Sequence, residues 1–186
     1  MRHGETEWSR DGRHTGRTDL PLTAEGERDA VALTPLLSGR TFDLVLASPL
    51  RRAWDTCRLA GFAAHAERCD DLMEWDYGVY EGRTTLDIQR EEPGWDVWTG
   101  MAAGAETADD VARRADRVIE RAAAVSGKVI AFAHAHLLRV LAARWLGLSP
   151  RSGRFWVLGA GSVSVLAYER ETRVIQRWNM PTGDVR

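Results

Sequence analysis

The sequence predicts an α/β fold, a three-layer α/β/α sandwich with a mostly parallel central sheet. Helical and strand-like patterns alternate along the 186 residues without a repeat, a low-complexity tract or a linker. Two short apolar runs, Asp43–Ala47 and Lys128–Ala133, are each followed by a helical pattern, as in strand-helix units. Serine, arginine and histidine residues come directly after the two runs. Because such sheets bind ligands at the carboxyl ends of their strands, we expect the functional site there.

The first half of the chain contains a helix, and then a strand that is followed by a second helix. Thr23 is the expected N-cap of the first helix, which runs to Leu37 and has acidic residues in its first turn. The apolar positions expected on the buried side of this helix are Ala30, Val31, Leu33 and Leu36. We expect Asp43–Ala47 to be a buried strand and Pro49–Leu59 to be the helix that follows it.

The second half repeats this order after a long amphipathic helix. The expected elements are a helix over Thr107–Val125, a strand over Lys128–Ala133, a helix over His136–Leu146, and strands over Ser162–Tyr168 and Arg173–Trp178. The last two strands are separated by a turn at Glu169–Thr172, which predicts a hairpin.

Composition and charge exclude several classes of protein. Hydrophobic residues make up 44% and charged residues 28% of a chain whose length suits one domain. The net charge of −2 provides no basic field for nucleic acid or an anionic membrane, although local arginines could still hold a small anion. The sequence has no signal peptide and no apolar run of about 18 residues, so we expect a cytoplasmic protein.

Cysteine usage predicts neither a metal site nor a disulfide framework. Cys57 and Cys69 lack the paired spacing of zinc ligands and are too few for a network of disulfides. Two reduced thiols are expected instead. Since no acidic or cysteine cluster has the spacing of metal ligands either, we expect no metal and no cofactor.

The segment Arg2–Trp8, Arg-His-Gly-Glu-Thr-Glu-Trp, carries the strongest indication of chemistry. A histidine between an arginine and a glycine suits a phosphoryl acceptor. Imidazole attacks phosphorus, guanidinium holds phosphate oxygens, and glycine lets the backbone approach closely. His3 is therefore the candidate nucleophile. Strings of three residues also recur by chance, so Arg2 and His3 could instead be an exposed terminal pair without a function.

Further motifs follow in a fixed order, and they favour a catalytic role for Arg2 and His3 over an exposed terminal pair. They are Thr15-Gly16, Asp19–Gly26, Ser48–Ala53, Glu74 with Gly78 and Glu81-Gly82, and finally His134. The series from Arg2 to about Leu148 resembles the histidine phosphatase superfamily, the phosphoglycerate-mutase-like phosphatases. The resemblance implies that residues 1–186 form a single histidine phosphatase domain with a phosphoglycerate-mutase-like fold.

The resemblance also implies which residues bind and receive the phosphoryl group. His3 matches the histidine that is phosphorylated, and Arg2 and Arg52 match two arginines that clamp the phosphate. His134 matches a second histidine, which hydrogen-bonds the phosphate opposite the nucleophile. These four residues are therefore expected to meet in the fold.

Glu74 stands where the family has its general acid. A carboxyl group in that role must hold its proton near the working pH, and a half-buried position beside Trp75 and Tyr77 could provide this by desolvation. Asp76 is the rival proton donor. The same carboxyl group can later serve as the base for a water that attacks the phosphohistidine.

Six further residues are candidates for substrate binding on the same resemblance. They are Ser9, Thr15, Gly16, Tyr77, Ala135 and His136. Ser9 stands where relatives often have asparagine, and Ala135 where many have glycine. His136 is assigned to the substrate side or to the support of the site. His14 and His65 match no motif, and we expect both to be exposed.

The predicted function is metal-independent hydrolysis of a phosphomonoester, through a phosphohistidine, on a small phosphorylated metabolite. The run Glu74–Gly82 is similar to that of sugar-bisphosphate phosphatases of the sedoheptulose-bisphosphatase type, which favours a sugar phosphate. Transfer of the phosphoglycerate mutase type is one alternative, although Thr85 stands where such mutases have lysine. A catalytically inactive module that binds a phosphorylated ligand is the other. We expect no nucleic-acid or membrane partner, and a homodimer is left open.

Two features should depart from a plain sandwich. Residues 75–106 are expected to be a small insertion over the active site, in which Trp95 and Trp98 either shape the pocket or, as we favour, hold the insertion down.

The family's buried first strand is missing, since only Met1 precedes Arg2. A strand of about five apolar residues would contribute about 7 to 15 kcal/mol. We therefore hypothesise that Met1 is an internal methionine of a chain that starts upstream, which an intact mass from the native host would test.

Overall fold

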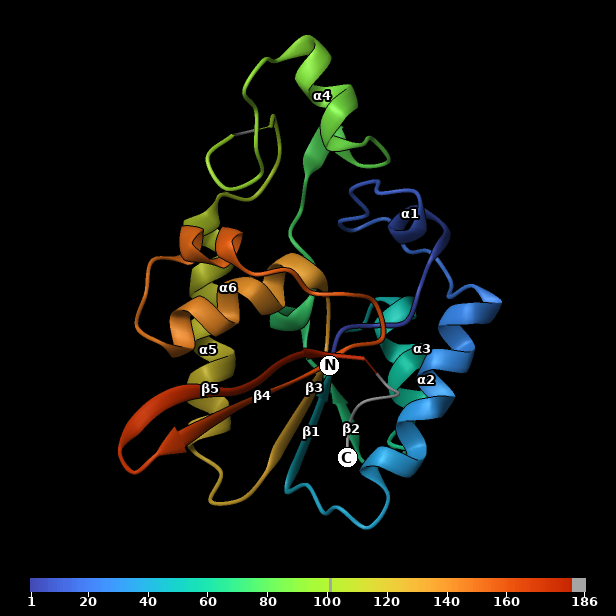
Figure 1. Ribbon diagram of the computed structural model, residues 1–186, viewed down its shortest axis with the longest axis vertical. Coiled ribbons are helices and arrows are strands. Elements are labelled where there is room, and N and C mark those ends of the chain that lie inside the picture. The colour runs from blue at the N-terminus through green and yellow to red at the C-terminus, as the bar shows by residue number, and fades with distance from the viewer. Residues whose placement is uncertain (101, 182–186) are drawn as a thin grey trace.

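The computed structural model describes residues 1–100 and 102–181, and Figure 1 shows the course of the chain. Within these ranges the helices are α1 (Glu7–Arg10), α2 (Ala24–Leu37), α3 (Arg51–Leu59), α4 (Thr85–Glu91), α5 (Ala108–Ala123) and α6 (Ala135–Trp145). Short 3-10 helices are η1 (Asp70–Leu72), η2 (Gly78–Tyr80) and η3 (Pro150–Phe155). The strands are β1 (Leu44–Ala47), β2 (Ala66–Arg68), β3 (Val129–Phe132), β4 (Val163–Glu169) and β5 (Thr172–Met180).

The central sheet has β1 in the middle, with β2 and β3 parallel to it on either side. Val45 of β1 lies beside Ala66 of β2 and Ile130 of β3. The two late strands, β4 and β5, form an antiparallel hairpin. The prediction that the two apolar runs are central strands of a parallel sheet is confirmed.

The start of the chain lies between this sheet and the hairpin. The amino group of Met1 donates a hydrogen bond to the carbonyl oxygen of Ala131 at 3.0 Å, and burial lowers the pKa of that amino group to about 5. The N–H of Arg2 donates to the carbonyl oxygen of Ser162 at 3.1 Å, just before β4. His3 therefore ends a short extended segment that is paired on both sides.

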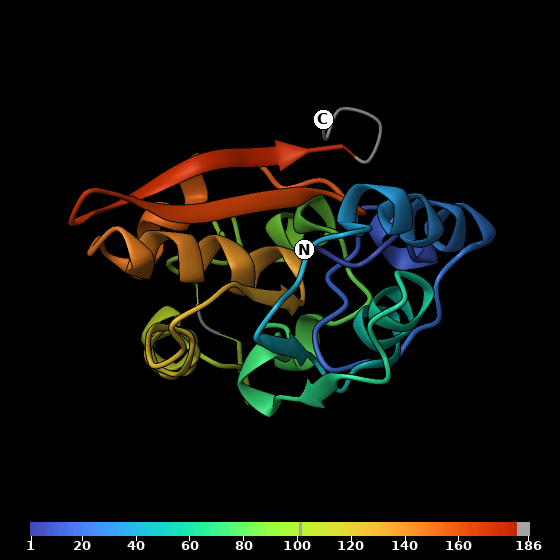
Figure 2. The same ribbon diagram turned by 90° about the horizontal axis from the view of Figure 1, so that it is seen from below.

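Side chains of the central strands point alternately into two hydrophobic clusters, one on each face of the sheet. Leu46 packs in a cluster with α5 and α6, whereas Val45 and Ala47 pack in a cluster with α2 and α3. Ile130 and Phe132 of β3 belong to the second cluster. Figure 1 and Figure 2 show the two helix pairs on opposite sides of the sheet, with the hairpin beside α6. The predicted three-layer α/β/α arrangement is confirmed.

Three described elements, α1, β2 and α4, were not among the predicted helices and strands, and one buried face differs from expectation. β2 is three residues long, and Glu67 and Arg68 in it are exposed, so neither length nor apolarity reveals it. α4 begins with a capping box between Thr84 and Asp87. On α2, Val31 is 52% exposed, which makes its assignment to the buried side wrong. The buried residues, which recur every three to four positions, are Gly26, Ala30, Leu33 and Leu37.

The segment that carries α4 lies at the end of the molecule opposite the β4–β5 turn, as Figure 1 shows. Its two tryptophans are buried. Trp98 packs edge-on against Trp75 with ring centroids 5.8 Å apart, and Trp95 packs edge-on against Tyr80 at 5.2 Å. Both contacts lie within residues 75–106, so the role favoured for the two tryptophans, to hold the insertion down, stays a prediction.

Candidate active site

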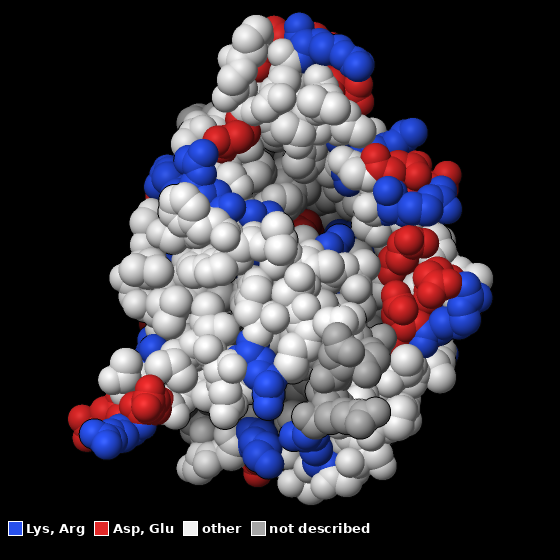
Figure 3. All heavy atoms as spheres, in the orientation of Figure 1, with Lys and Arg blue, Asp and Glu red and all other residues white. Residues whose placement is uncertain are grey.

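The motif residues meet at the carboxyl edge of the central sheet. His3 ends the segment beside β3, Ser48 follows β1 directly, and His134 follows β3 and is the N-cap of α6. Arg52 lies in the first turn of α3. Figure 3 shows a hollow on this face of the molecule, with acidic and basic atoms on its floor. The fold thus assembles residues from the start, the middle and the second half of the chain at one place.

His3 is buried, and its two ring nitrogens have different surroundings. Nδ1 lies 2.7 Å from the carbonyl oxygen of Gly4, and since a carbonyl can only accept, Nδ1 carries the ring hydrogen. Burial lowers the pKa of His3 well below its usual value, and the charges of Arg52 and Arg2 lower it further. His3 is therefore neutral at physiological pH, with a free electron pair on Nε2.

Gly4 explains why the motif needs a glycine after the histidine. A Cβ at Gly4 would lie 2.2 Å from the carbonyl oxygen of Gly26, in the first turn of α2. The N–H of Gly4 donates to Oγ1 of Thr56 at 3.1 Å, and that hydroxyl donates to the carbonyl oxygen of Arg52 at 2.7 Å. Close backbone packing and this shared hydroxyl hold the histidine loop against α2 and α3 together.

The two arginines of the motifs are desolvated and make no ion pair with any described carboxylate. Arg52 is fully buried and donates from Nη1 to the carbonyl oxygen of Thr18 at 2.9 Å and from Nη2 to that of Gly16 at 2.7 Å. Arg2 donates from Nη1 to a backbone carbonyl. Burial lowers the pKa of both guanidinium groups, and the negative charge of Glu74 acts in the opposite direction. Both arginines stay charged and have charge to offer an anion.

His134 is fully buried and lies beside His3. Its ring centroid lies 5.2 Å from that of His3, with the ring planes inclined by 58°. Nε2 lies 2.8 Å from Oγ of Ser48, which holds the orientation of the ring. Burial lowers the pKa of His134 well below its usual value, and the charge of Arg52 lowers it further. A neutral ring held in this way can donate one hydrogen bond.

Three buried nitrogens around His3 make no hydrogen bond with the residues that the structure describes. They are Nε of Arg2, Nε of Arg52 and Nδ1 of His134. A buried donor that stays unpaired costs about 1 to 3 kcal/mol, so proteins rarely keep several together without a ligand for them. Their common neighbourhood, beside a neutral Nε2, is suited to an anion with several oxygens.

Glu74 is buried and its carboxylate is held by backbone N–H groups. Oε1 accepts from the N–H groups of Trp75 and Leu137 at 2.9 Å each, and Oε2 accepts from that of His136 at 3.1 Å. Two of these donors belong to the first turn of α6, whose N–H groups have no partners inside the helix. Asp76 instead accepts from Gly78 N–H at 2.9 Å, in its own turn. The structure therefore brings Glu74, and not its rival, against the helix that follows His134.

A buried ion pair holds the segment that carries Glu74. Arg114 of α5 donates from Nε and Nη2 to the two carboxylate oxygens of Glu106 at 2.7 and 2.8 Å. Its Nη1 donates to the carbonyl oxygens of Asp71 and Met73 at 2.8 and 2.9 Å. Burial alone would raise the pKa of Glu106, but hydrogen bonds from Arg114 and its charge hold it below the usual value. Nothing in the sequence pattern pairs these residues.

The hydroxyl groups of Ser9 and Thr15 each donate a hydrogen bond to a nearby backbone carbonyl. The hydroxyl of Ser9 accepts from the N–H of Thr6 at 2.9 Å and donates to the carbonyl oxygen of Thr6 at 3.0 Å, so its hydrogen is used in the cap of α1. The hydroxyl of Thr15 donates to the carbonyl oxygen of Arg13 at 3.5 Å. Ser9 is therefore part of the helix cap in this arrangement, and its assignment as a phosphate hydrogen-bonder stays a prediction.

Gly16 contributes through its backbone, since its carbonyl oxygen accepts from Arg52. Its φ of +49° is in the left-handed region, and a Cβ there would lie 1.9 Å from Oε1 of Glu81. Glu81 accepts from the N–H groups of Arg17 at 2.6 Å and Thr18 at 2.8 Å. The Glu81 carboxylate thus holds the loop whose carbonyl groups hold Arg52, a role that the glutamate-glycine motif alone did not reveal.

Tyr77 and His136 form a pair at the edge of the site. The hydroxyl of Tyr77 lies 2.6 Å from Nδ1 of His136. Burial, with the charge of Glu74, raises the pKa of Tyr77 well above its usual value. Burial, with the charge of Arg139, lowers the pKa of His136 well below its usual value. A protonated tyrosine and a neutral imidazole fit O–H donation to Nδ1, and Ala135 precedes His136 as the first residue of α6.

His14 is buried, which makes the expectation of an exposed side chain wrong. Its ring centroid lies 4.8 Å from that of Tyr77 and 5.4 Å from that of Trp95, and Nε2 lies 3.2 Å from Oγ1 of Thr85. Burial lowers the pKa of His14 to about 4. The α4 segment, together with Tyr77 and with His136 of α6, covers this histidine. His65 is exposed as predicted.

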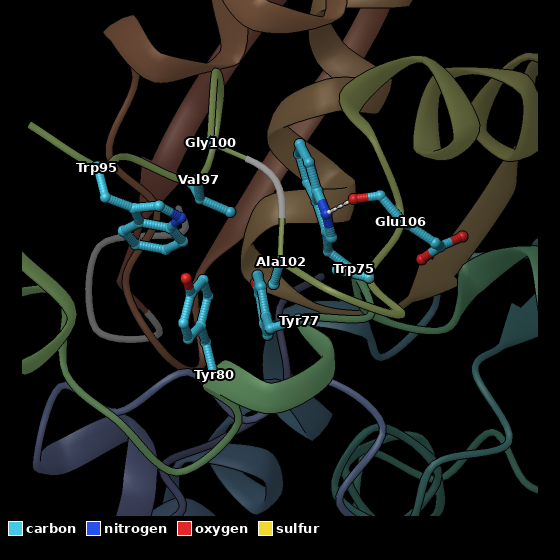
Figure 4. A pocket seen from close by; sticks show the side chains of 9 residues that line it. Trp75, Tyr77, Tyr80, Trp95, Val97, Gly100, Ala102 and Glu106 are labelled. Carbon is cyan, nitrogen blue, oxygen red and sulfur yellow. Dashed lines mark hydrogen bonds between the residues drawn. The ribbon is translucent and has the colours of Figure 1, made fainter. Parts of the chain in front are cut away.

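An aromatic cavity lies behind Tyr77, and Figure 4 shows Trp95, Tyr80 and Trp75 around it. Its lining consists of Trp75, Tyr77, Tyr80, Trp95, Val97, Gly100, Ala102, Ala105 and Glu106. The indole N–H of Trp75 donates to the carbonyl oxygen of Glu106 at 2.8 Å. Residues of the α4 segment and residues next to Glu74 line this cavity together.

The part of the chain that the structure describes contains neither a candidate metal-binding cluster nor a helix that could span a membrane. No group of three or more His, Cys, Asp and Glu side chains in that part of the chain could hold a metal ion. No helix in it is long and apolar enough to cross a membrane.

Comparisons with known proteins agree with this geometry. The family model described as "Histidine phosphatase superfamily (branch 1)" matches residues 1–181. An acid phosphatase of Mycobacterium tuberculosis is 38% identical over 177 residues, which cover 93% of this chain and 87% of that protein. Sedoheptulose 1,7-bisphosphatase of Saccharomyces cerevisiae is 33% identical over 181 residues, covering 80% of this chain and 66% of the yeast protein. A solved structure from a Mycobacterium tuberculosis open reading frame superimposes with a TM-score of 0.92 at 36% identity, covering 97% and 95% of the two chains.

Proposed function

The chain belongs to the histidine phosphatase superfamily, branch 1, as a phosphatase, and we propose that it hydrolyses phosphomonoesters of small metabolites through a phosphohistidine on His3. One observation carries the proposal. Three buried, unpartnered donors from Arg2, Arg52 and His134 surround a neutral imidazole whose Nε2 is free. Such donors are placed to bind the oxygens of a phosphoryl group while a lone pair faces its phosphorus.

In the first step of this scheme, Nε2 of His3 attacks phosphorus and the bond to the ester oxygen breaks. The guanidinium groups of Arg2 and Arg52 and the N–H of His134 stabilise the charge on the non-bridging oxygens in the transition state. Glu74 enters this step in its protonated form and gives its proton to the departing oxygen, so the product leaves as an alcohol and Glu74 becomes a carboxylate. The imidazole keeps the hydrogen on Nδ1, bonded to Gly4, and carries the phosphoryl group on Nε2.

In the second step, water attacks the phosphohistidine. The carboxylate of Glu74 takes a proton from the attacking water, inorganic phosphate leaves, and His3 returns to its neutral form. Side chains supply all the positive charge that this scheme needs, so the proposed reaction is metal-independent. Cytoplasmic location and a homodimer remain predictions from the sequence.

Sugar phosphates are the substrate class that we propose. The support is the 33% identity to a yeast enzyme named for a sugar bisphosphate, together with the similar run from Glu74 to Gly82. The Tyr77 and His136 pair at the edge of the site offers a hydroxyl and an imidazole that could meet sugar hydroxyl groups.

Hydrolysis of p-nitrophenyl phosphate in EDTA, from about pH 5 to pH 7.5, tests the proposal, together with peptide mapping at alkaline pH of a trapped phosphohistidine, whose P–N bond is stable in base but not in acid. We expect turnover and labelling of His3 in the wild type, and loss of both in His3→Ala. His65→Ala, which replaces an exposed histidine, is the matched control and should behave as the wild type. Turnover that persists in His3→Ala would contradict the proposal. Transfer to a second hydroxyl without phosphate release would point to a mutase, and phosphate binding without turnover to a binding module.

A further inference from the structure

Three arginines in the described part of the chain share an unusual environment. Burial lowers the pKa of Arg2, Arg52 and Arg139, and none of the three forms an ion pair with a described carboxylate. By contrast, Arg114, which is also buried, is paired with Glu106. The scheme above uses Arg2 and Arg52 for the transferred phosphoryl group. It leaves Arg139 without a function.

Arg139 lies on the wall of the same site. It follows His136 by three residues on α6, which puts both on one side of the helix. Its guanidinium carbon lies 4.7 Å from the ring centroid of Trp98, and the same ring lies 5.4 Å from that of His136. His136 in turn contacts the hydroxyl of Tyr77. Arg139, Trp98, His136 and Tyr77 therefore form one contiguous cluster of side chains, in which Trp98 and Tyr77 are buried.

The charge of Arg139 acts on the catalytic groups. The negative charge of Glu74 raises the pKa of Arg139, and Arg139 in turn lowers the pKa of Arg2 and His136. Charges influence one another in this way only across short distances or through a poorly solvated region. Figure 3 shows basic atoms at the rim of the hollow as well as on its floor.

The head group of Arg139 is held in place from one side only. Nε donates to the carbonyl oxygen of Gly153 at 2.9 Å and Nη2 to that of Arg154 at 3.3 Å, both in η3. Gly153 permits this approach, because a Cβ there would lie 2.9 Å from the ring of Trp98. Nη1 makes no hydrogen bond with the described residues, so a fixed and unpaired cationic donor remains.

We propose that Arg139 binds a second anionic group of the substrate, a phosphate or a carboxylate located several atoms from the scissile ester. The inference rests on the proposed function and narrows it to small metabolites with two anionic groups, such as sugar bisphosphates or phosphorylated hydroxy acids. A planar guanidinium that is stacked and partly desolvated is well suited to binding either group.

Arg139→Gln tests this inference with three substrates. Fructose 1,6-bisphosphate carries a second phosphate, 3-phosphoglycerate carries a carboxylate, and p-nitrophenyl phosphate carries neither. We expect kcat/KM for at least one of the first two, relative to p-nitrophenyl phosphate, to fall roughly 10- to 100-fold, mainly through KM. The substrate whose ratio falls identifies the second group. Arg144→Gln, on the same helix but paired with Asp116 at 2.9 Å, is the control and should leave the ratios unchanged.

Arg139→Lys separates recognition from a purely structural role. Lysine keeps the charge but not the paired donors to η3, so it should recover part of the lost ratio if the charge binds substrate. Equal losses for all three substrates, with Lys no better than Gln, would show that Arg139 only ties η3 to α6. Unchanged ratios in Arg139→Gln would also overturn the inference.

A measurement on the wild type covers the case in which the variants do not fold. Fructose 1,6-bisphosphate should inhibit hydrolysis of p-nitrophenyl phosphate about 10-fold more strongly than fructose 6-phosphate, which lacks the second phosphate, or 3-phosphoglycerate should do so relative to glycerol 3-phosphate. Equal inhibition within both pairs would overturn the inference alone. Absence of His3-dependent turnover of p-nitrophenyl phosphate would instead reject the proposed function, so the two failures are distinguishable.

Discussion

At the scale of single residues, the site depends on groups whose hydrogen bonds leave one atom free. The carbonyl of Gly4 binds Nδ1 of His3 and leaves Nε2, and Ser48 binds Nε2 of His134 and leaves Nδ1. The two rings therefore offer opposite functions, an electron pair and a donor, although both are neutral imidazoles. Their neighbours in space, and not their residue type, decide which nitrogen is available.

Replacement of Glu74 by Gln tests its role as proton donor. The amide cannot protonate a leaving alkoxide, so kcat should fall by roughly 10² to 10⁴ for an alkyl phosphate such as glycerol 3-phosphate. The loss should be much smaller for p-nitrophenyl phosphate, whose leaving group needs no proton. Asp76→Asn is the control for the rival donor. Equal losses for good and poor leaving groups in Glu74→Gln would rule out the acid role.

Thr56→Val tests the shared hydroxyl between the histidine loop and α3. Valine has nearly the same shape, but it leaves the N–H of Gly4 and the carbonyl of Arg52 without their partner. We expect the free energy of unfolding in urea to fall by about 1 to 3 kcal/mol. Thr41→Val, at an exposed threonine whose hydroxyl makes no hydrogen bond with the described residues, is the control. If both substitutions have the same effect, the hydroxyl does not stabilise the loop.

At the scale of elements, helix starts and tight loops place the charges. The first turn of α6 holds the carboxylate of Glu74, and the loop at residues 16–18 holds the guanidinium of Arg52 through its carbonyl groups. Both arrangements use backbone N–H or C=O groups that take part in no hydrogen bond of a helix or strand. Catalytic side chains therefore depend on the conformation of segments that do not themselves react.

Glu81→Gln tests the support of this loop. The amide nitrogen must face an N–H group of the loop, which loses at least one of the bonds to Arg17 and Thr18. Because the loop holds Arg52, we expect inorganic phosphate to inhibit about 10-fold more weakly. Glu91→Gln changes an exposed glutamate on α4 and should leave the inhibition constant as it is. An unchanged constant in both variants would show that Arg52 needs no support from Glu81.

At the scale of the whole molecule, four histidines are removed from solvent where the α4 segment, α6 and the sheet edge meet: His3, His14 and His134 are buried and His136 is half-buried. Burial lowers the pKa of His3, His14, His134 and His136 from the usual 6.5, in the case of His14 to about 4. In the unfolded chain these rings take up protons below about pH 6.5, whereas in the folded protein they resist until a lower pH. The folded state is thus disfavoured progressively as the pH falls below 6.5.

Stability should therefore fall between about pH 6.5 and pH 5. Each histidine whose pKa is lowered contributes up to about 1.4 kcal/mol per pH unit in this range. His14→Gln removes one of these groups while its amide can still bond Thr85, so its free energy of unfolding should depend less steeply on pH than that of the wild type. His65→Gln, at an exposed position, should keep the wild-type slope. Identical slopes in all three proteins would contradict the prediction.

Much of the fold and the core of the site could be predicted from the sequence. The long periodic segments α2, α5 and α6 and the apolar strands β1 and β3 occur where their patterns place them, within two residues. The ordered motifs located His3, Arg2, Arg52, Glu74 and His134, which the fold brings to one edge of the sheet. Periodicity, caps and strand-end motifs are local properties of the chain, so they can be read from neighbouring residues.

Only the tertiary structure decided how those residues are oriented and what surrounds them. It buries His14, uses the hydroxyl of Ser9 in a helix cap, pairs Arg114 with Glu106, and leaves Arg139 unpaired on the aromatic wall. The sequence by itself therefore determined the order of elements, the family and the candidate residues of the site. Burial, hydrogen-bond partners and unpaired charges depend on segments that are far apart along the chain, and no local pattern specifies which of them will meet.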